Sequence, residues 1–163
     1  MSSSSYRLVR VVGVARPLIC DTTLLIAVLG EPAAVPGFVR SFLGRQVYLP
    51  AVALAEVYAG TRGPRDGRLV DQIAHAFALV DRVLTPTADE WARAGRLINR
   101  AIRLRGAMQP RDHLADVLIV HLAARLRGAV VTANVVDFDG WVSLGRLDVA
   151  VLPHRSAGGP GLP

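Results

Sequence analysis

The chain has 163 residues and a mass of 17.4 kDa, which is the size of one ordinary domain, so two independent domains are not expected. Hydrophobic residues make up 52% of it and charged residues 20%, which excludes wholesale disorder, and a single cysteine, Cys20, excludes an internal disulfide framework and a thiolate zinc site. All 19 basic residues are arginines, and against 13 acids they give a net charge of +6. This balance favours a polyanionic partner such as nucleic acid or an acidic protein, although a codon bias toward arginine would produce the same composition.

The ends of the chain differ from its middle. We expect residues 1–17 to be a partly disordered N-terminal extension, 18–152 to form the domain, and 153–163 to be a flexible tail. The valine-rich segment 7–15 could add a strand. The longest stretch without a charged residue, Gln46–Ala55, is far shorter than a membrane span, and the N-terminus lacks a signal peptide's apolar region. We therefore expect a soluble cytoplasmic protein.

Short apolar runs alternate with longer helical patterns along the chain. Helices are predicted at Val52–Tyr58, Ala88–Arg105 and Leu114–Arg127, and a turn at 63–67. This alternation predicts an α/β fold, a mostly parallel sheet with helices on both faces, in which ligands bind at the carboxyl ends of the strands. The predicted strands are Leu18–Cys20, Val47–Leu49, Val83–Leu84, Ala129–Thr132 and Val149–Leu152.

Two acids stand out in the first half of the chain. Asp21 directly follows the first predicted strand, so its carboxylate is placed at the carboxyl edge of the sheet, where it either caps the next helix or serves in a site. Glu56 lies in a short, otherwise apolar helix, and such a carboxylate faces solvent or binds a cation.

The second half of the chain supplies further acids. Asp116 lies near the start of a strongly apolar helix, where the helix dipole favours its ionised form. Asp112, four residues earlier, either shares a cation with Asp116 or caps the helix, and the capping role is favoured. After the fourth strand the chain turns polar, and it places Thr132, Asn134 and Asp137 near the same edge, with Asp139 as a solvated alternative to Asp137.

Carboxylates that gather at one sheet edge repel each other unless cations neutralise them. Oxygen-only ligands suit Mg²⁺ or Mn²⁺ rather than Zn²⁺, and two such ions can activate a water molecule and stabilise the leaving oxygen of a phosphodiester. The residues predicted to form this metal site are Asp21, Glu56, Asp116 and Asp137, with Asp112, Asn134 and Thr132 as additional candidates.

Four sequence blocks resemble the PIN-domain ribonucleases, and among these the VapC-type toxins of bacterial toxin–antitoxin pairs. The blocks are Ile-Cys-Asp-Thr-Thr-Leu-Leu, Leu-Ala-Glu-Val-Tyr-Ala-Gly, Ala-Asp-Val-Leu-Ile-Val-His-Leu-Ala and Val-Val-Thr-Ala-Asn-Val-Val-Asp-Phe, and the resemblance covers about residues 18–152. It implies a three-layer α/β/α fold and a Mg²⁺-dependent endoribonuclease, commonly dimeric, inhibited by a cognate antitoxin. By motif, Asp21, Glu56 and Asp116 match the three core acids, and either Asn134 or Asp137 matches the last position.

Arginines concentrate in the predicted helix Ala88–Arg105. Arg93, Arg96, Arg100 and Arg103 fall within one arc of the helix and form an arginine face, which indicates a track for RNA phosphates, a dock for an acidic antitoxin segment, or a solvated surface. A weaker basic cluster comprises Arg62, Arg65 and Arg68.

The remaining signals are weaker. The histidines do not form a metal-ligand spacing; His113 is the closest to the predicted site, and capping or exposure is favoured for it over phosphate contact. Both tryptophans, Trp91 and Trp141, are expected to pack in the interior.

Two other functions remain open from the sequence alone. A PIN-like protein could bind RNA or a protein partner without catalysis. A phosphotransfer domain of the aspartate-at-strand-end type is disfavoured, because Thr23 stands where that chemistry needs a second aspartate two residues after Asp21.

Overall fold

The computed structural model describes residues 16–43 and 45–154, and both the valine-rich segment 7–15 and the predicted tail from residue 155 onward lie outside these ranges. All five strands of the described chain pair in parallel in the order β3-β2-β1-β4-β5. The predicted strands are confirmed, with β5 beginning one residue later than expected. Their bounds are β1 Leu18–Cys20, β2 Val47–Pro50, β3 Val83–Leu84, β4 Ala129–Thr132 and β5 Ala150–Pro153.

Seven α-helices lie among the described residues. The helix predicted at Ala88–Arg105 is confirmed at both ends, and the other two predicted helices are confirmed to within two residues at each end. The turn predicted at 63–67 is wrong, because Pro64 begins a helix there, in a position where its missing N–H costs nothing. The helices are α1 Thr22–Leu29, α2 Val35–Leu43, α3 Ala51–Ala59, α4 Pro64–Ala78, α5 Ala88–Arg105, α6 Leu114–Arg125 and α7 Val135–Gly145, with 3₁₀ turns η1 Pro32–Ala34 and η2 Pro110–Asp112.

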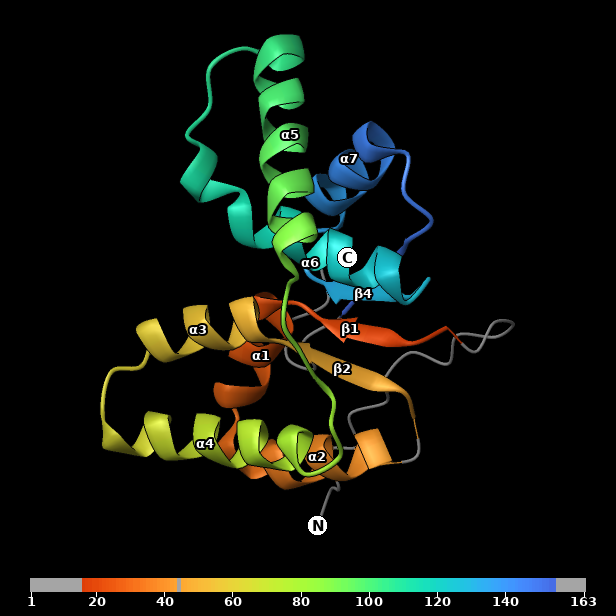
Figure 1. Ribbon diagram of the computed structural model, residues 1–163. Helices are drawn as coiled ribbons and strands as arrows, with labels where there is room; N and C mark the ends of the chain where they lie inside the picture. Colours follow the sequence, from red (N-terminus) through yellow and green to blue (C-terminus); the bar gives the residue numbers. More distant parts are fainter. Residues whose placement is uncertain (1–15, 44, 155–163) are drawn as a thin grey trace, which may run out of the picture.

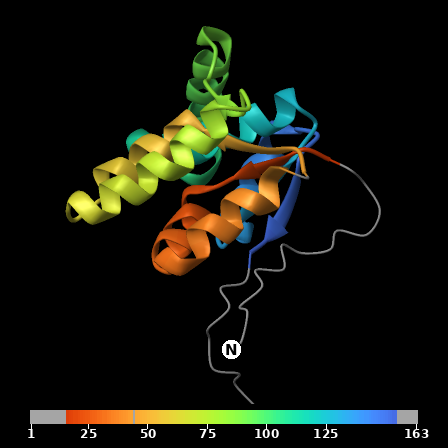
Figure 2. The ribbon, with the colours of Figure 1, turned by 90° about the horizontal axis from the view of Figure 1, so that it is seen from below.

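The strand order divides the helices between the two faces of the sheet. The chain runs from β1 outward to β2 and β3 and then returns to β4 and β5 on the opposite side of β1. Since parallel crossovers are right-handed, α1–α4 cover one face and α5–α7 cover the other (Figures 1 and 2). The three-layer α/β/α fold expected from the sequence is confirmed.

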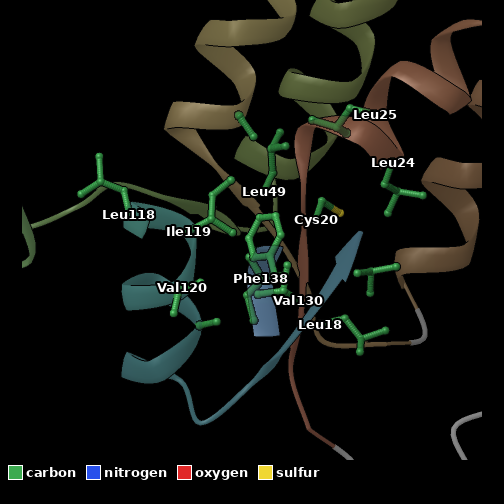
Figure 3. Close-up of a cluster of buried hydrophobic side chains, with 14 of the residues drawn as sticks. Leu18, Cys20, Leu24, Leu25, Leu49, Leu118, Ile119, Val120, Val130 and Phe138 are labelled. Atoms are coloured by element: carbon green, nitrogen blue, oxygen red, sulfur yellow. The ribbon is translucent and has the colours of Figure 1, made fainter. Parts of the chain in front are cut away.

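The core fills the space on both sides of the central strands. Ile19 of β1 and Val130 of β4 are fully buried. Figure 3 shows Leu118, Ile119 and Val120 of α6 on one side of these strands, and Leu24 and Leu25 of α1 on the other. Because β1 and β4 lie between two packed layers, the residues that follow them are held on a rigid base.

Helix α5 is fastened at its N-terminal end and extends away from the sheet (Figure 1). Thr87 and Glu90 form a reciprocal capping box, and the buried Glu90 carboxylate also accepts a hydrogen bond of 3.1 Å from Arg125 at the end of α6. The expectation that both tryptophans pack is confirmed for Trp141, which is 3% exposed, and wrong for Trp91, which is 46% exposed on α5.

No single helix in the described ranges is long and apolar enough to cross a membrane. Only Thr22–Leu29 and Pro32–Ser41 taken together reach the required length and composition, and a bend of 105° separates these two segments.

Gly128, between α6 and β4, allows a close approach of two backbones. A Cβ atom there would overlap Ile19 Cδ1 and would lie 2.7 Å from the carbonyl oxygen of Pro17. That carbonyl already accepts the N–H of Ala129 at 2.8 Å, so it cannot move without breaking the sheet. We expect Gly128→Ala to lower the free energy of unfolding by about 1–3 kcal/mol, measured by urea denaturation.

A matched glycine provides the control for this prediction. Gly95 lies inside α5 with nothing within 4 Å of its would-be Cβ. Gly95→Ala should stabilise the protein by up to about 1 kcal/mol, because alanine has the higher helix propensity. A Gly128→Ala variant as stable as the parent protein would contradict the close approach.

Candidate metal site at the sheet edge

The strand order reverses between β1 and β4, the point at which open parallel sheets bind ligands beyond the strands' carboxyl ends. Asp21 follows β1 directly, and Asn134 and Asp137 follow β4. The other two predicted acids come from helices packed beside this edge, Glu56 from α3 and Asp116 from the first turn of α6.

Asp21 is the most deeply buried of the four acids, with 2% of its surface exposed. Its Oδ2 atom accepts hydrogen bonds of 2.7 Å from the hydroxyls of both Thr23 and Thr132, and a longer one of 3.4 Å from the backbone N–H of Thr23. Asp21 is therefore the N-cap of α1, which is one of the two roles expected for it. Every hydrogen bond to this carboxylate from the described residues goes to Oδ2, so Oδ1 keeps its lone pairs for another ligand.

Glu56 and Asp137 are held in a similar way, although both are exposed. The hydroxyl of Thr22 donates a short hydrogen bond to Oε2 of Glu56, and the side-chain amide of Asn134 donates one of 2.7 Å to Oδ2 of Asp137. In each case the described residues hydrogen-bond one oxygen and leave the second one available.

Asp116 receives no side-chain hydrogen bond from the described residues and is half-buried. Burial raises the pKa of its carboxyl group from 3.8 to about 7, with further contributions, in decreasing order, from the negative charges of Asp21, Glu56 and Asp137. The negative charges of all three other predicted acids thus contribute to the raised pKa of this one carboxyl group.

The chemistry of these four carboxylates suits a divalent cation. The carboxylate of Asp116, whose ionised form is disfavoured by burial and by the three neighbouring negative charges, would be stabilised by a hard cation, and the three anchored carboxylates each offer a free oxygen. Within the described ranges, no three His, Cys, Asp or Glu side chains already stand at the spacing of direct metal ligands. Like-charged groups without a cation are expected to stand apart in this way.

The additional candidates have different places. Thr132 is fully buried and supports Asp21, and Asn134 supports Asp137. The expectation that Asp112 caps the helix is wrong, because η2 ends at Asp112 and His113 occupies the N-cap position of α6. Asp112 is exposed, pairs weakly with Arg111 at 3.6 Å, and is not among the charges that raise the pKa of Asp116.

Sequence reasoning missed three residues at this edge. Thr22 and Thr23 supply the hydroxyls that orient Glu56 and Asp21, and His154 follows β5 next to Thr132, whose carbonyl accepts its backbone N–H at 3.0 Å. Burial lowers the pKa of the His154 imidazole, while the charge of Asp21 and the backbone of Thr23 act in the opposite direction. Its place directly after a strand was the signal that could have identified it.

The arginine face of α5 is exposed along its length. Asp89, just before the arginine-rich stretch, pairs with Arg93 at 2.6 Å and with Arg96 at 3.9 Å, so these two arginines are partly neutralised. Arg100 and Arg103 form no ion pair with the described residues, and they carry the uncompensated part of the face.

Comparison with known proteins places the fold. No family model and no curated relative matches the sequence. The chain is similar to solved structures of VapBC2 from Rickettsia felis bound to a DNA fragment from their promoter (12% identity, 85% of this chain and 98% of that chain, TM-score 0.57) and of DNA-bound VapBC from Salmonella typhimurium (17% identity, 85% and 98%, TM-score 0.56). FitAcB from Neisseria gonorrhoeae is similar at 20% identity over 83% of this chain and 96% of that chain, with a TM-score of 0.55.

At these identities the similarity concerns the fold. It spans nearly the whole length of the matched chains, and it agrees with the resemblance to VapC-type PIN domains that the four sequence blocks carry.

Proposed function

We propose that this protein is the toxin of a toxin–antitoxin pair and acts as a Mg²⁺-dependent endoribonuclease, with Mn²⁺ as an alternative ion. The observation that carries the proposal is that the negative charges of Asp21, Glu56 and Asp137 all raise the pKa of Asp116 at the edge of the sheet where the strand order reverses. The fold shared with VapBC and FitAcB structures supports the same function.

The residues of the candidate site have two roles: some would bind the ion, and others orient the side chains that bind it. Asp21, Glu56, Asp116 and Asp137 would hold Mg²⁺ through carboxylate oxygens, and the bound ion would supply activation of water and charge stabilisation at the scissile phosphate. The hydroxyls of Thr132 and Thr23 hold Oδ2 of Asp21 by hydrogen bonds, so the carboxylate would not need to rotate for Oδ1 to bind the ion. Asn134 fixes Asp137 in the same manner.

The partners follow from the same proposal. RNA is the substrate, and the exposed arginine face of α5 binds its phosphates or an acidic segment of the antitoxin. The cognate antitoxin inhibits the enzyme, which acts as a homodimer in the cytoplasm. The resemblance to structures of VapBC assemblies supports a protein partner of this kind.

Metal removal tests the proposed activity. Purified protein should cleave a mixture of structured and single-stranded RNAs in Mg²⁺ or Mn²⁺, lose all cleavage in EDTA, and regain it when excess Mg²⁺ is restored, as resolved on denaturing gels. Co-expression with the short open reading frame adjacent to its gene should give a complex in which cleavage is suppressed. Cleavage that persists in EDTA would contradict the metal-dependent mechanism.

A second candidate function is a PIN-like module that binds RNA or a protein without catalysis. The specific observation in its favour is that no three potential ligands in the described ranges stand at metal-binding spacing. RNA binding without cleavage at every Mg²⁺ and Mn²⁺ concentration would favour this module over the nuclease.

A further inference from the structure

One buried tryptophan connects the helices that carry two of the four acids. Trp141 of α7 is 3% exposed, and its ring lies against the imidazole of His113, with ring centroids 5.5 Å apart and an angle of 56° between the planes. This tilted arrangement is one that aromatic pairs favour. Because His113 precedes the first residue of α6, the contact joins α7 to the N-terminal end of α6.

The same ring also contacts the end of α5. The guanidinium carbon of Arg105, the last residue of α5, lies 5.9 Å from the centroid of Trp141, within the range of cation–π interactions. The guanidinium group also approaches Gly140, where a Cβ would lie 3.6 Å from Arg105 Nη2. Trp141 thus contacts side chains from two other elements, the end of α5 and the N-cap of α6.

The contact lies next to the candidate ligands along the chain. Trp141 follows Asp137 by four residues, one helical turn, and His113 precedes Asp116 by three. The imidazole of His113 makes no capping hydrogen bond to α6, so packing against Trp141 is the interaction that the structure shows for it. The contact therefore links the N-terminal end of α6, which carries Asp116, to α7, which carries Asp137.

We propose that Trp141, with His113, is a positioning residue of the metal site and sets the separation of Asp116 from Asp137. The inference rests on the proposed function, because it needs these acids to be metal ligands. It adds a requirement that carboxylates alone do not meet, namely that two helices keep the separation that one cation can bridge.

The experiment measures Mn²⁺ affinity by calorimetry, without RNA and without turnover. Relative to the parent protein, Trp141→Leu and His113→Ala should each weaken Mn²⁺ binding about five- to tenfold, since aromatic contacts of this kind carry roughly one tenfold step in an equilibrium constant. The ring-preserving variants Trp141→Phe and His113→Phe should keep the affinity within about twofold.

Two controls separate positioning from loss of stability. Phe77→Leu alters a buried ring of α4 on the other face of the sheet, so it should lower the melting temperature and leave Mn²⁺ affinity unchanged. Trp91→Phe alters the exposed tryptophan and should change neither. His113 is half-buried, so His113→Ala tests the idea even where Trp141→Leu fails to fold.

The outcomes separate this inference from the proposed function. If the parent protein binds Mn²⁺, Asp116→Asn abolishes binding, and both Trp141→Leu and His113→Ala bind as tightly as the parent, the positioning role is overturned and the nuclease proposal stands. If the parent protein shows no Asp116-dependent binding, both proposals fall.

Discussion

We expect Asp116→Asn to abolish Mg²⁺-dependent RNA cleavage and, in the same molecule, to stabilise the metal-free protein at neutral and alkaline pH. Catalysis should fall at least about a hundredfold, because metal ions contribute several kcal/mol to such reactions and each 1.36 kcal/mol is a factor of ten. An ordinary structural aspartate would give the opposite result for stability. Loss of cleavage together with a gain in stability would therefore identify Asp116 as a carboxylate that destabilises the metal-free fold and is needed to bind the metal.

The sign of the stability effect follows from the pKa of Asp116. Burial and the neighbouring carboxylates raise that pKa to about 7, above its ordinary value of 3.8, so between these two pH values the folded protein binds more protons than the unfolded chain. Stability is consequently lost as pH rises from about 4 to about 7. Asparagine removes this loss, and we expect a gain of about 1–2 kcal/mol at pH 8 after allowing for solvent screening of a half-buried group.

Urea denaturation in EDTA at pH 5 and pH 8 measures this effect. The free energy of unfolding of the variant should exceed that of the parent protein at pH 8 and should be closer to it at pH 5. Added Mn²⁺ should stabilise only the parent protein. Asp112→Asn is the matched control, since Asp112 is exposed and does not act on Asp116, and it should change neither cleavage nor stability. An Asp116→Asn variant that is less stable than the parent at pH 8 would contradict the repulsive site.

Much of the fold was predictable because its strands are short, apolar and flanked by helix signals. Helix α5 was predicted residue for residue, and in the structure Thr87 is its N-cap and Gly106 follows its last residue. The start of helix α4 was predicted as a turn at residues 63–67, because this segment contains Gly63, Pro64 and Gly67. Pro64 fits the first turn of a helix, and the helical spacing of buried residues further along α4 outweighs the local cost of Gly67.

The candidate site was predictable to the extent that strand ends share one edge. Placement after β1 and β4 predicted the positions of Asp21 and Asp137, but not which oxygen each would present. For Asp21, the free oxygen depends on Thr23 and Thr132, whose hydroxyls meet at 3.4 Å across 109 positions of sequence. Contacts of this kind arise from tertiary packing and leave no local pattern.

The arginine face of α5 should contribute to RNA affinity through its uncompensated part. Asp89 already pairs with Arg93 and Arg96, whereas Arg100 and Arg103 carry free charge within the described structure. We expect the triple variant Arg96→Gln, Arg100→Gln and Arg103→Gln to bind RNA about ten- to a hundredfold more weakly, and the salt dependence of log K to flatten by roughly 0.7 for each phosphate that the variant no longer neutralises. Fluorescence anisotropy in the cleavage-deficient Asp116→Asn background measures both quantities.

The control removes equal charge elsewhere. Arg62, Arg65 and Arg68 are exposed near the start of α4, and changing all three to glutamine lowers the net charge by the same amount. If RNA follows α5, this second triple variant should weaken binding less than the α5 variant does. Equal weakening by the two would show that overall charge, rather than the α5 surface, attracts RNA. Unchanged RNA affinity together with loss of antitoxin binding would instead make the arginine face the surface that receives the acidic segment of the antitoxin.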